Sequence, residues 1–168
     1  WIMPNPGDAG SAIGAVLAHK KQTLPMDHAY LGYNIEGEYP VEETISELKT
    51  SGIAGVANGR AEFGPRAFGN RSLLADPRGS DIKDRVNDIK QRQRFRPFAP
   101  VVLEEHASDY FEGHYNNYMQ FTSRVRDPHL YPAITHADGT ARVQTVPRDG
   151  SGIRRLLERW YQETGCPM

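Results

Sequence analysis

The segment GIRRLLERWYQETG, residues 152–165, constrains the fold of this chain more than any other. Its apolar residues have the i, i+3, i+4, i+7, i+8 spacing of a helix with one buried face, and they are Ile153, Leu156, Leu157, Trp160 and Tyr161. Gly165 follows as a C-terminal stop. Such a helix needs a sheet or other helices to cover its apolar face, so the pattern predicts a packed globular domain.

Further helices and short strands are expected along the chain. Residues 7–21 predict a helix with Asp8 at its N-cap or in its first turn, and residues 23–40 read as a connector. A helical face formed by Val41, Ile45 and Leu48 ends at Gly52, and the apolar run IAGVA (53–57) predicts a buried strand.

The second half of the chain continues this alternation. We expect Ser80 to cap a helix that carries Ile82, Val86 and Ile89 on its buried face. Strands are predicted within FRPFAPVVLEE (95–105), NYMQFTSRV (117–125) and TARVQTV (140–146), the last with alternating faces. The expected fold class is therefore mixed α/β (α+β).

Composition limits the function classes. The chain has 168 residues, a formal net charge of -1 and one cysteine, Cys166, so an internal disulfide and a thiolate-cluster zinc site are excluded. No apolar run approaches the ~20 residues of a membrane span, and no signal-peptide pattern precedes the first helix. We expect a cytoplasmic protein without a membrane partner.

Positive charge is concentrated in one region. The sequence GRAEFGPRAFGNRSLLADPR, residues 59–78 and called here the arginine–glycine segment, sets four arginines among three glycines. Between residues 60 and 96 there are ten Lys or Arg and five Asp or Glu. Guanidinium groups bind phosphate or carboxylate oxygens, and glycines let backbone N–H groups approach the same anion. The segment predicts an oxyanion pocket, unless its glycines only serve turns and its arginines are solvated or paired with aspartates.

Nucleic acid is the alternative ligand class for this region. Basic residues interleaved with Phe63, Phe68, Phe95 and Phe98 are able to contact phosphates and stack on bases. The acids spread through residues 76–88 interrupt a phosphate track, and the net charge provides no long-range attraction. We therefore expect no nucleic-acid partner.

A second set of polar residues lies in THADGTARVQTV, residues 135–146. His136 offers a proton-transfer group, Asp138 an orienting carboxylate or substrate contact, and Arg142 a further anion contact. An Asp-Gly pair before a strand is also an ordinary turn, and a single histidine often has a purely structural hydrogen bond.

Three blocks of this sequence resemble the C-terminal domain of the carbamoyltransferase family, which includes nodulation-factor and antibiotic O-carbamoyltransferases. They are the arginine–glycine segment, RFRPFAP (94–100) and THADGTARVQTV. The resemblance implies a YrdC-like twisted mixed sheet with flanking helices at residues 41–168, a linker at 25–40, and a helical remnant of an actin-like ATPase-type domain at 1–24.

The same resemblance implies chemistry and ligands. The YrdC-like part is expected to use ATP, Mg²⁺ and carbamoyl phosphate to make carbamoyl-adenylate, and the actin-like part to pass the carbamoyl group to a hydroxyl-bearing acceptor. Residues expected to act in catalysis are Arg60, Arg66, Arg71 and His136. Those expected to bind substrate or nucleotide are Glu62, Gly64, Gly69, Asn70, Ser72, Lys90, Arg94, Arg96, Asp138 and Arg142.

Asp8 resembles an aspartate that contributes to a site for iron or another divalent metal in the actin-like domain, where the partner histidines would lie upstream of Trp1. One carboxylate does not hold iron alone, so in this chain Asp8 is better described as a helix N-terminal acid. Without its parent domain, the apolar face of this helix is exposed, or it packs on the rest of the chain or on another copy to form a homo-oligomer.

Two further interpretations stay open at this point. Family members continue beyond Met168 with a segment implicated in nucleotide binding, so we expect the isolated chain to be inactive or partly active. The alternatives to carbamoyl activation are a noncatalytic RNA-binding YrdC-like module and a threonylcarbamoyl-adenylate-type synthase.

Overall fold

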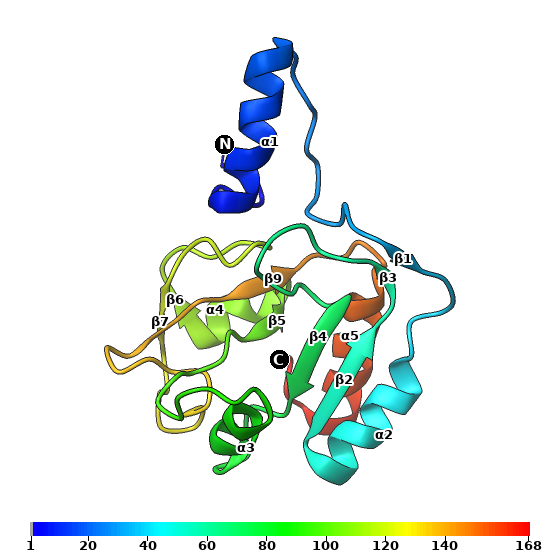
Figure 1. Cartoon of the computed structure of the whole chain (residues 1–168). Helices are drawn as coiled ribbons and strands as arrows, with labels where there is room; N and C mark the ends of the chain where they lie inside the picture. The colour runs from blue at the N-terminus through cyan, green and yellow to red at the C-terminus, as the bar shows by residue number, and fades with distance from the viewer. Residues whose placement is uncertain (1) are drawn as a thin grey trace.

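The structure, a computed structural model, describes residues 2–168 and contains short strands interleaved with helices (Figure 1). In chain order the elements are α1 (Asp8–Lys20), β1 (Asn34–Ile35), α2 (Val41–Ser51), β2 (Ile53–Ala57), β3 (Gly59–Arg60), β4 (Arg71–Ala75), α3 (Ile82–Ile89), β5 (Val101–Leu103), the 3₁₀ turn η1 (Glu104–His106), α4 (Ala107–Tyr110), β6 (Phe111–Glu112), β7 (Ser123–Val125), β8 (Thr140–Ala141), β9 (Gln144–Val146) and α5 (Gly152–Thr164). The mixed α/β class is confirmed.

The strands pair in four small sheets rather than along one continuous sheet. Their orders are β1–β3, β2–β4, β5–β9 and β6–β7–β8. The β5–β9 pair is parallel and the other strand pairs are antiparallel, so the pairing is mixed.

The main core lies where α2 and α5 pack together against β2 and β5 (Figure 1). On α5, Ile153, Leu156, Leu157 and Trp160 are all buried, as the helical spacing predicts, whereas Tyr161 is 37% exposed. Gly165 has a positive φ and ends the helix. The amphipathic helix therefore forms one wall of the core.

Strand β5 joins this core to a second apolar cluster. Leu103 packs in the core beside α5, whereas its neighbour Val102 packs with Phe111, Val125 and Val143 in the second cluster. Consecutive side chains of a strand point to opposite faces, so one short strand serves both clusters.

Two sequence predictions for this part of the chain are wrong in detail. Asp81, not Ser80, occupies the N-cap position of α3, and neither provides a side-chain cap. Ile89 is 59% exposed because only the first two turns of α3 reach the core, through Ile82 and Val86.

The predicted strand at residues 140–146 is two strands that belong to different sheets. β8 pairs with β7, and β9 pairs with β5, so the chain changes sheets at Arg142 and Val143. All three residues of β9 are buried, which removes the expected alternation.

Helix α1 stands apart from the body of the structure (Figure 1). Gly10 is its only buried residue, and Val16 is 59% exposed. The chain on either side of α1 is attached to the body: Gln120 Nε2 donates to the carbonyl of Met3 at 2.6 Å, and the hydroxyl of Tyr118 donates to the carbonyl of Asp27 at 3.2 Å. The expected division of the chain into a remnant at residues 1–24, a linker at 25–40 and a domain at 41–168 stays a prediction.

Within the described residues, no helix combines the length and the apolar character that a membrane span needs.

A buried arginine ties α5 to η1. The side chain of Arg154 is 3% exposed, and its Nη1 and Nη2 donate to the two carboxylate oxygens of Glu105 at 2.8 and 2.7 Å. Its Nε donates to Glu158 at 2.8 Å and Nη1 donates to the carbonyl of Val146 at 3.1 Å. The hydrogen bonds that Arg154 donates to the Glu105 carboxylate lower the pKa of Glu105 to about 2.

We expect Glu105→Gln to lower the free energy of unfolding by about 2 kcal/mol at neutral pH, because Arg154 stays buried without its bidentate partner. A carboxyl whose pKa is lowered by folding stabilises the fold above its unfolded pKa and loses that contribution as the pH falls through its folded pKa. The difference between parent and variant should therefore shrink from about pH 4.5 towards pH 2. Urea unfolding followed by circular dichroism measures it.

Lys49→Gln is the matched control, because it breaks the exposed Lys49–Glu163 pair instead. A loss in Glu105→Gln no larger than the loss in this control would contradict the stabilising role of the buried pair.

Candidate functional site

A single carboxylate organises the middle of the arginine–glycine segment. Glu62 Oε1 accepts hydrogen bonds from the backbone N–H groups of Phe68 at 2.7 Å, Asn70 at 2.8 Å and Arg71 at 3.4 Å. The arginine–glycine pattern predicts that backbone N–H groups of this segment approach a bound anion. In the structure, the N–H groups of Phe68, Asn70 and Arg71 instead bind the carboxylate of Glu62, which belongs to the same segment. These hydrogen bonds close residues 62–71 into a loop.

The carbonyl groups of the same turn are also held. Phe68 O accepts from the hydroxyl of Tyr30 at 3.2 Å and from Gln144 Nε2 at 3.1 Å, and Gly69 O accepts from the hydroxyl of Tyr39 at 2.8 Å. Burial raises the pKa of Tyr30 and of Tyr39, and the negative charge of Glu62 raises both further. Both phenols therefore stay protonated and serve as donors.

Gly69 lets this turn approach α5. Its φ is +119°, and a Cβ at this position would lie 2.8 Å from the Cβ of Ile153. A side chain here would meet both backbone strain and the buried helix. Glycine at position 69 therefore serves close packing of the turn on α5.

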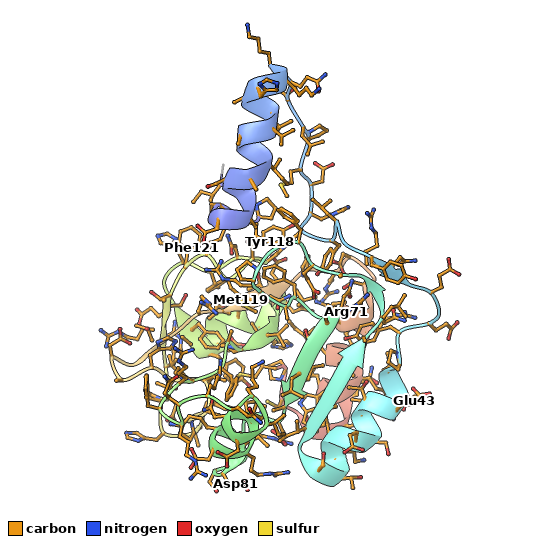
Figure 2. The ribbon with its side chains drawn as sticks, viewed as in Figure 1. Glu43, Arg71, Asp81, Tyr118, Met119 and Phe121 are labelled. Atoms are coloured by element: carbon orange, nitrogen blue, oxygen red, sulfur yellow. The ribbon has the colours of Figure 1, made fainter. Side chains whose placement is uncertain are left out.

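Arg71 is bound by the backbone around it. Its Nη1 donates to the carbonyls of Asn58 at 2.9 Å and Asn70 at 2.8 Å, and its Nη2 donates to those of Tyr33 at 3.1 Å and Gly59 at 3.2 Å. Figure 2 shows Arg71 at the start of β4, beside the connector that precedes α2. Its contacts favour a role in holding the loop over direct contact with an anion.

A cavity of about 300 Å³ lies between the arginine–glycine segment and the core. Its apolar lining includes Phe98, Leu156 and Trp160. Five cationic residues from different parts of the chain also line it, and no Asp, Glu or His of the described residues does; we call it the cationic cavity, and the five are Arg66, Arg71, Lys90, Arg92 and Arg142.

Arg66 and Arg142 come together at this cavity from segments 76 residues apart in sequence. Burial lowers the pKa of Arg142, and the positive charge of Arg66 lowers it further, so the two guanidinium groups lie within electrostatic reach of each other. Across residues 2–168, neither forms a salt bridge. Two like charges without a carboxylate partner favour an added anion.

Comparison with known proteins identifies the family. A family model described as the carbamoyltransferase C-terminus matches residues 45–168. The chain belongs to this family. The resemblance seen in the three sequence blocks is thereby confirmed.

Several nodulation proteins are similar to the whole chain or most of it. Nodulation protein U of Sinorhizobium fredii is 36% identical over 186 residues, which cover 100% of this chain and 33% of the relative. Nodulation protein NolNO of the same organism is 35% identical over 202 residues, covering 100% of this chain and 30% of the relative. Nodulation protein NolO of Bradyrhizobium diazoefficiens is 37% identical over 183 residues, covering 88% and 33%. The chain thus spans about a third of the length of these curated relatives.

The structure brings only part of the predicted site together. Of the candidate residues taken from the family resemblance, those that line the cationic cavity are Arg66, Gly69, Arg71, Ser72, Lys90 and Arg142. Those that lie outside its lining are Arg60, Glu62, Gly64, Asn70, Arg94, Arg96, His136 and Asp138. The functional role of each stays a prediction.

Several residues outside the lining have structural contacts of their own. Arg60 donates to the carbonyls of Leu31 at 3.1 Å and Gly32 at 3.4 Å, and Arg94 pairs with Asp88 at 2.8 Å. These contacts turn Arg60 and Arg94 towards protein groups.

The turn after His136 is an ordinary Asp-Gly turn. Asp138 Oδ1 accepts from the backbone N–H of Thr140 at 3.0 Å and from its hydroxyl at 2.7 Å, and these hydrogen bonds lower the pKa of Asp138. The backbone N–H of His136 donates to the carbonyl of Thr140 at 2.7 Å. Of the polar residues predicted here, only Arg142 reaches the cationic cavity.

Sequence reasoning missed Arg92, Asn87 and Gln144. Asn87 is fully buried on α3 next to Val86, and an asparagine beside the apolar face of a predicted helix was the available signal. Gln144 reaches the turn at Phe68 across 76 residues of sequence, and no local pattern indicates such a contact.

Asp8 lies exposed in the first turn of α1. In the described part of the chain, no group of three or more His, Cys, Asp or Glu side chains is placed to hold a metal ion. The iron site that the resemblance implies takes its histidines from upstream of Trp1, so the role of Asp8 in it stays a prediction.

We expect Glu62→Ala to speed hydrogen exchange at the amides of Phe68 and Asn70 by about 10- to 100-fold, because each loses a charge-assisted hydrogen bond. Exchange rates from NMR measure this effect. Glu43→Ala, on the exposed face of α2, removes a carboxylate without touching the turn and should leave these rates unchanged. Unchanged rates in Glu62→Ala would contradict the organising role of Glu62.

Proposed function

We propose that the cationic cavity binds the phosphate group of carbamoyl phosphate, and that this chain is the part of an O-carbamoyltransferase in which the carbamoyl group is activated. The observation that carries the proposal is the convergence of Arg66 and Arg142 on one cavity without an acidic partner. A volume of about 300 Å³ suits a small metabolite, because it is at the lower end of the range for ligand pockets.

The proposed reaction consumes carbamoyl phosphate, ATP and water and yields carbamoyl-adenylate, inorganic phosphate and pyrophosphate. Water attacks the phosphorus of carbamoyl phosphate and the bond from this phosphorus to the carbamoyl oxygen breaks, which gives inorganic phosphate and carbamate. A carbamate oxygen then forms a bond to the α-phosphorus of ATP, while the bond from the α-phosphorus to the bridging oxygen breaks and pyrophosphate leaves. Negative charge develops on phosphate oxygens in each step. Preorganised guanidinium groups stabilise that charge without a protein nucleophile.

The cofactors are part of the same proposal. The lining of the cavity supplies no carboxylate for Mg²⁺, so we expect ATP to carry this ion on its own phosphates. No step of this chain is assigned to iron, because a single carboxylate such as Asp8 does not hold it alone. We place the hydroxyl acceptor and the final transfer with the portion of the full-length relatives beyond this chain.

The surface charges argue against an RNA-binding module. Three of the basic residues between positions 60 and 96 form ion pairs with aspartates: Arg78 with Asp76, Arg85 with Asp81, and Arg94 with Asp88. These pairs neutralise part of the surface that a phosphate track would need, while Arg66, Lys90 and Arg92 line a cavity.

We expect Arg66→Gln and Arg142→Gln each to weaken carbamoyl phosphate binding by about tenfold or more, because each removes charge-assisted hydrogen bonds to the phosphate. Isothermal titration calorimetry of the 168-residue chain measures the affinities. Arg78→Gln is the matched control: it lies in the same segment, but its side chain pairs with Asp76 and does not line the cavity.

Equal binding by the parent chain and Arg66→Gln would remove Arg66 from the site. A parent chain that binds RNA with a steep inverse dependence on salt, and that gives no heat with carbamoyl phosphate or ATP, would overturn the proposed function in favour of the RNA module.

A further inference from the structure

A buried asparagine braces the chain that follows α3. Asn87 is 0% exposed, and its Nδ2 donates to the carbonyls of Arg94 at 3.2 Å and Arg96 at 2.9 Å. These bonds fold residues 90–96 back over the end of the helix. A buried amide with both of its N–H groups used in this way fixes the course of that loop.

The remaining acceptor of Asn87 orients Arg92. The Oδ1 of Asn87 accepts a hydrogen bond from Arg92 Nε, and the Arg92 guanidinium lies over the ring of Phe98 with its central carbon 4.4 Å from the ring centroid. Arg92 Nη2 reaches the carbonyl of Pro97 at 3.5 Å. The planar group is therefore held on one edge and on one face.

This arrangement presents the rest of the guanidinium to the cationic cavity. Arg92, Phe98 and Lys90 all line that cavity, and within residues 2–168 neither cation forms a salt bridge. Lys90 and Arg92 come from the loop that follows α3, whereas Arg66 comes from the arginine–glycine segment and Arg142 from the chain just before β9. The cations of the lining are thus supplied by separate stretches of the chain.

We propose that Arg92 and Lys90 form a second anion subsite of the cationic cavity, which takes a second phosphoryl group, and that Asn87 is the residue that positions Arg92 for it. The inference rests on the proposed function, because it assumes that Arg66 and Arg142 hold a first phosphate. It adds a binding residue and a positioning residue that neither the sequence pattern nor the family resemblance identified.

Inorganic tripolyphosphate is the probe for the second subsite, because it carries separated phosphoryl groups on a linear chain. Calorimetric titration should show Arg92→Gln binding it about tenfold more weakly than the parent chain. Arg85→Gln is the matched control: it lies on α3, pairs with Asp81 and lines no part of the cavity. Equal affinities for Arg92→Gln and Arg85→Gln would overturn the second subsite.

The role of Asn87 is tested by a double-mutant cycle with the same probe. Asn87→Ala should weaken tripolyphosphate binding in the parent background and have no further effect in the Arg92→Gln background, because the two residues act through one guanidinium. Equal losses in both backgrounds would mean that Asn87 only supports the fold. Circular dichroism establishes that each variant is folded.

A second variant covers the case in which Asn87→Ala does not fold. Asn87→Asp keeps the volume and the acceptor oxygen, and its carboxylate neutralises Arg92, so tripolyphosphate binding should fall about as far as in Arg92→Gln. Unchanged binding in Asn87→Asp would contradict the positioning role.

The titrations with carbamoyl phosphate and with tripolyphosphate distinguish a failure of the second subsite from a failure of the proposed function. Weakened binding in Arg66→Gln together with parent-like binding in Arg92→Gln would leave the first phosphate site intact and remove the second. A parent chain that binds neither carbamoyl phosphate nor tripolyphosphate would remove both.

Discussion

The carboxylate of Glu62 is the interaction on which the candidate site depends. It accepts hydrogen bonds from the backbone N–H groups of Phe68, Asn70 and Arg71, and so closes the arginine–glycine segment into a loop at the point where β4 begins. Tyr30, Tyr39 and Gln144 then hold the carbonyls of the same turn from the connector and from β9. Segments far apart in the sequence therefore meet at one turn, beside the cavity. The hydrogen bonds to Glu62 use the backbone N–H groups that an external anion would otherwise bind.

Because the backbone donors of this turn are used internally, recognition of an anion falls to side chains. The chain separates its positive charge into two populations accordingly. Arg78, Arg85 and Arg94 lie at the surface and pair with aspartates, whereas the cations of the cavity have no carboxylate within the lining. A cation without a partner is costly when it is partly desolvated, and bringing such groups together costs more still. A bound anion would offset both costs, and this is the physical reason for proposing that the cavity takes a ligand of high negative charge.

The sequence predicts those elements whose signal is local. The spacing of Ile153, Leu156, Leu157 and Trp160 identified α5 and its buried face, and the family resemblance brought Arg66 and Arg142 forward among the candidate residues. Prediction from the sequence failed where the environment of a residue is formed by segments that are distant in the sequence. The split of residues 140–146 into β8 and β9 depends on two different partner strands, β7 and β5. Arg92 looked like one more charge in a basic run, because its orientation is set by an asparagine that is buried only in the folded chain.

The lining of the cavity also indicates which part of a carbamoyl transfer this chain suits. With no Asp, Glu or His in the lining among the described residues, it has no general base of the usual kind to take a proton from an acceptor hydroxyl. Guanidinium and ammonium groups instead suit a step in which phosphate oxygens gain charge and leave. Activation of the carbamoyl group is such a step, whereas its transfer to a hydroxyl requires a proton acceptor. The chain spans about a third of the length of its nodulation-protein relatives. We therefore propose that the proton acceptor for the transfer step lies in the remaining two thirds of the full-length protein.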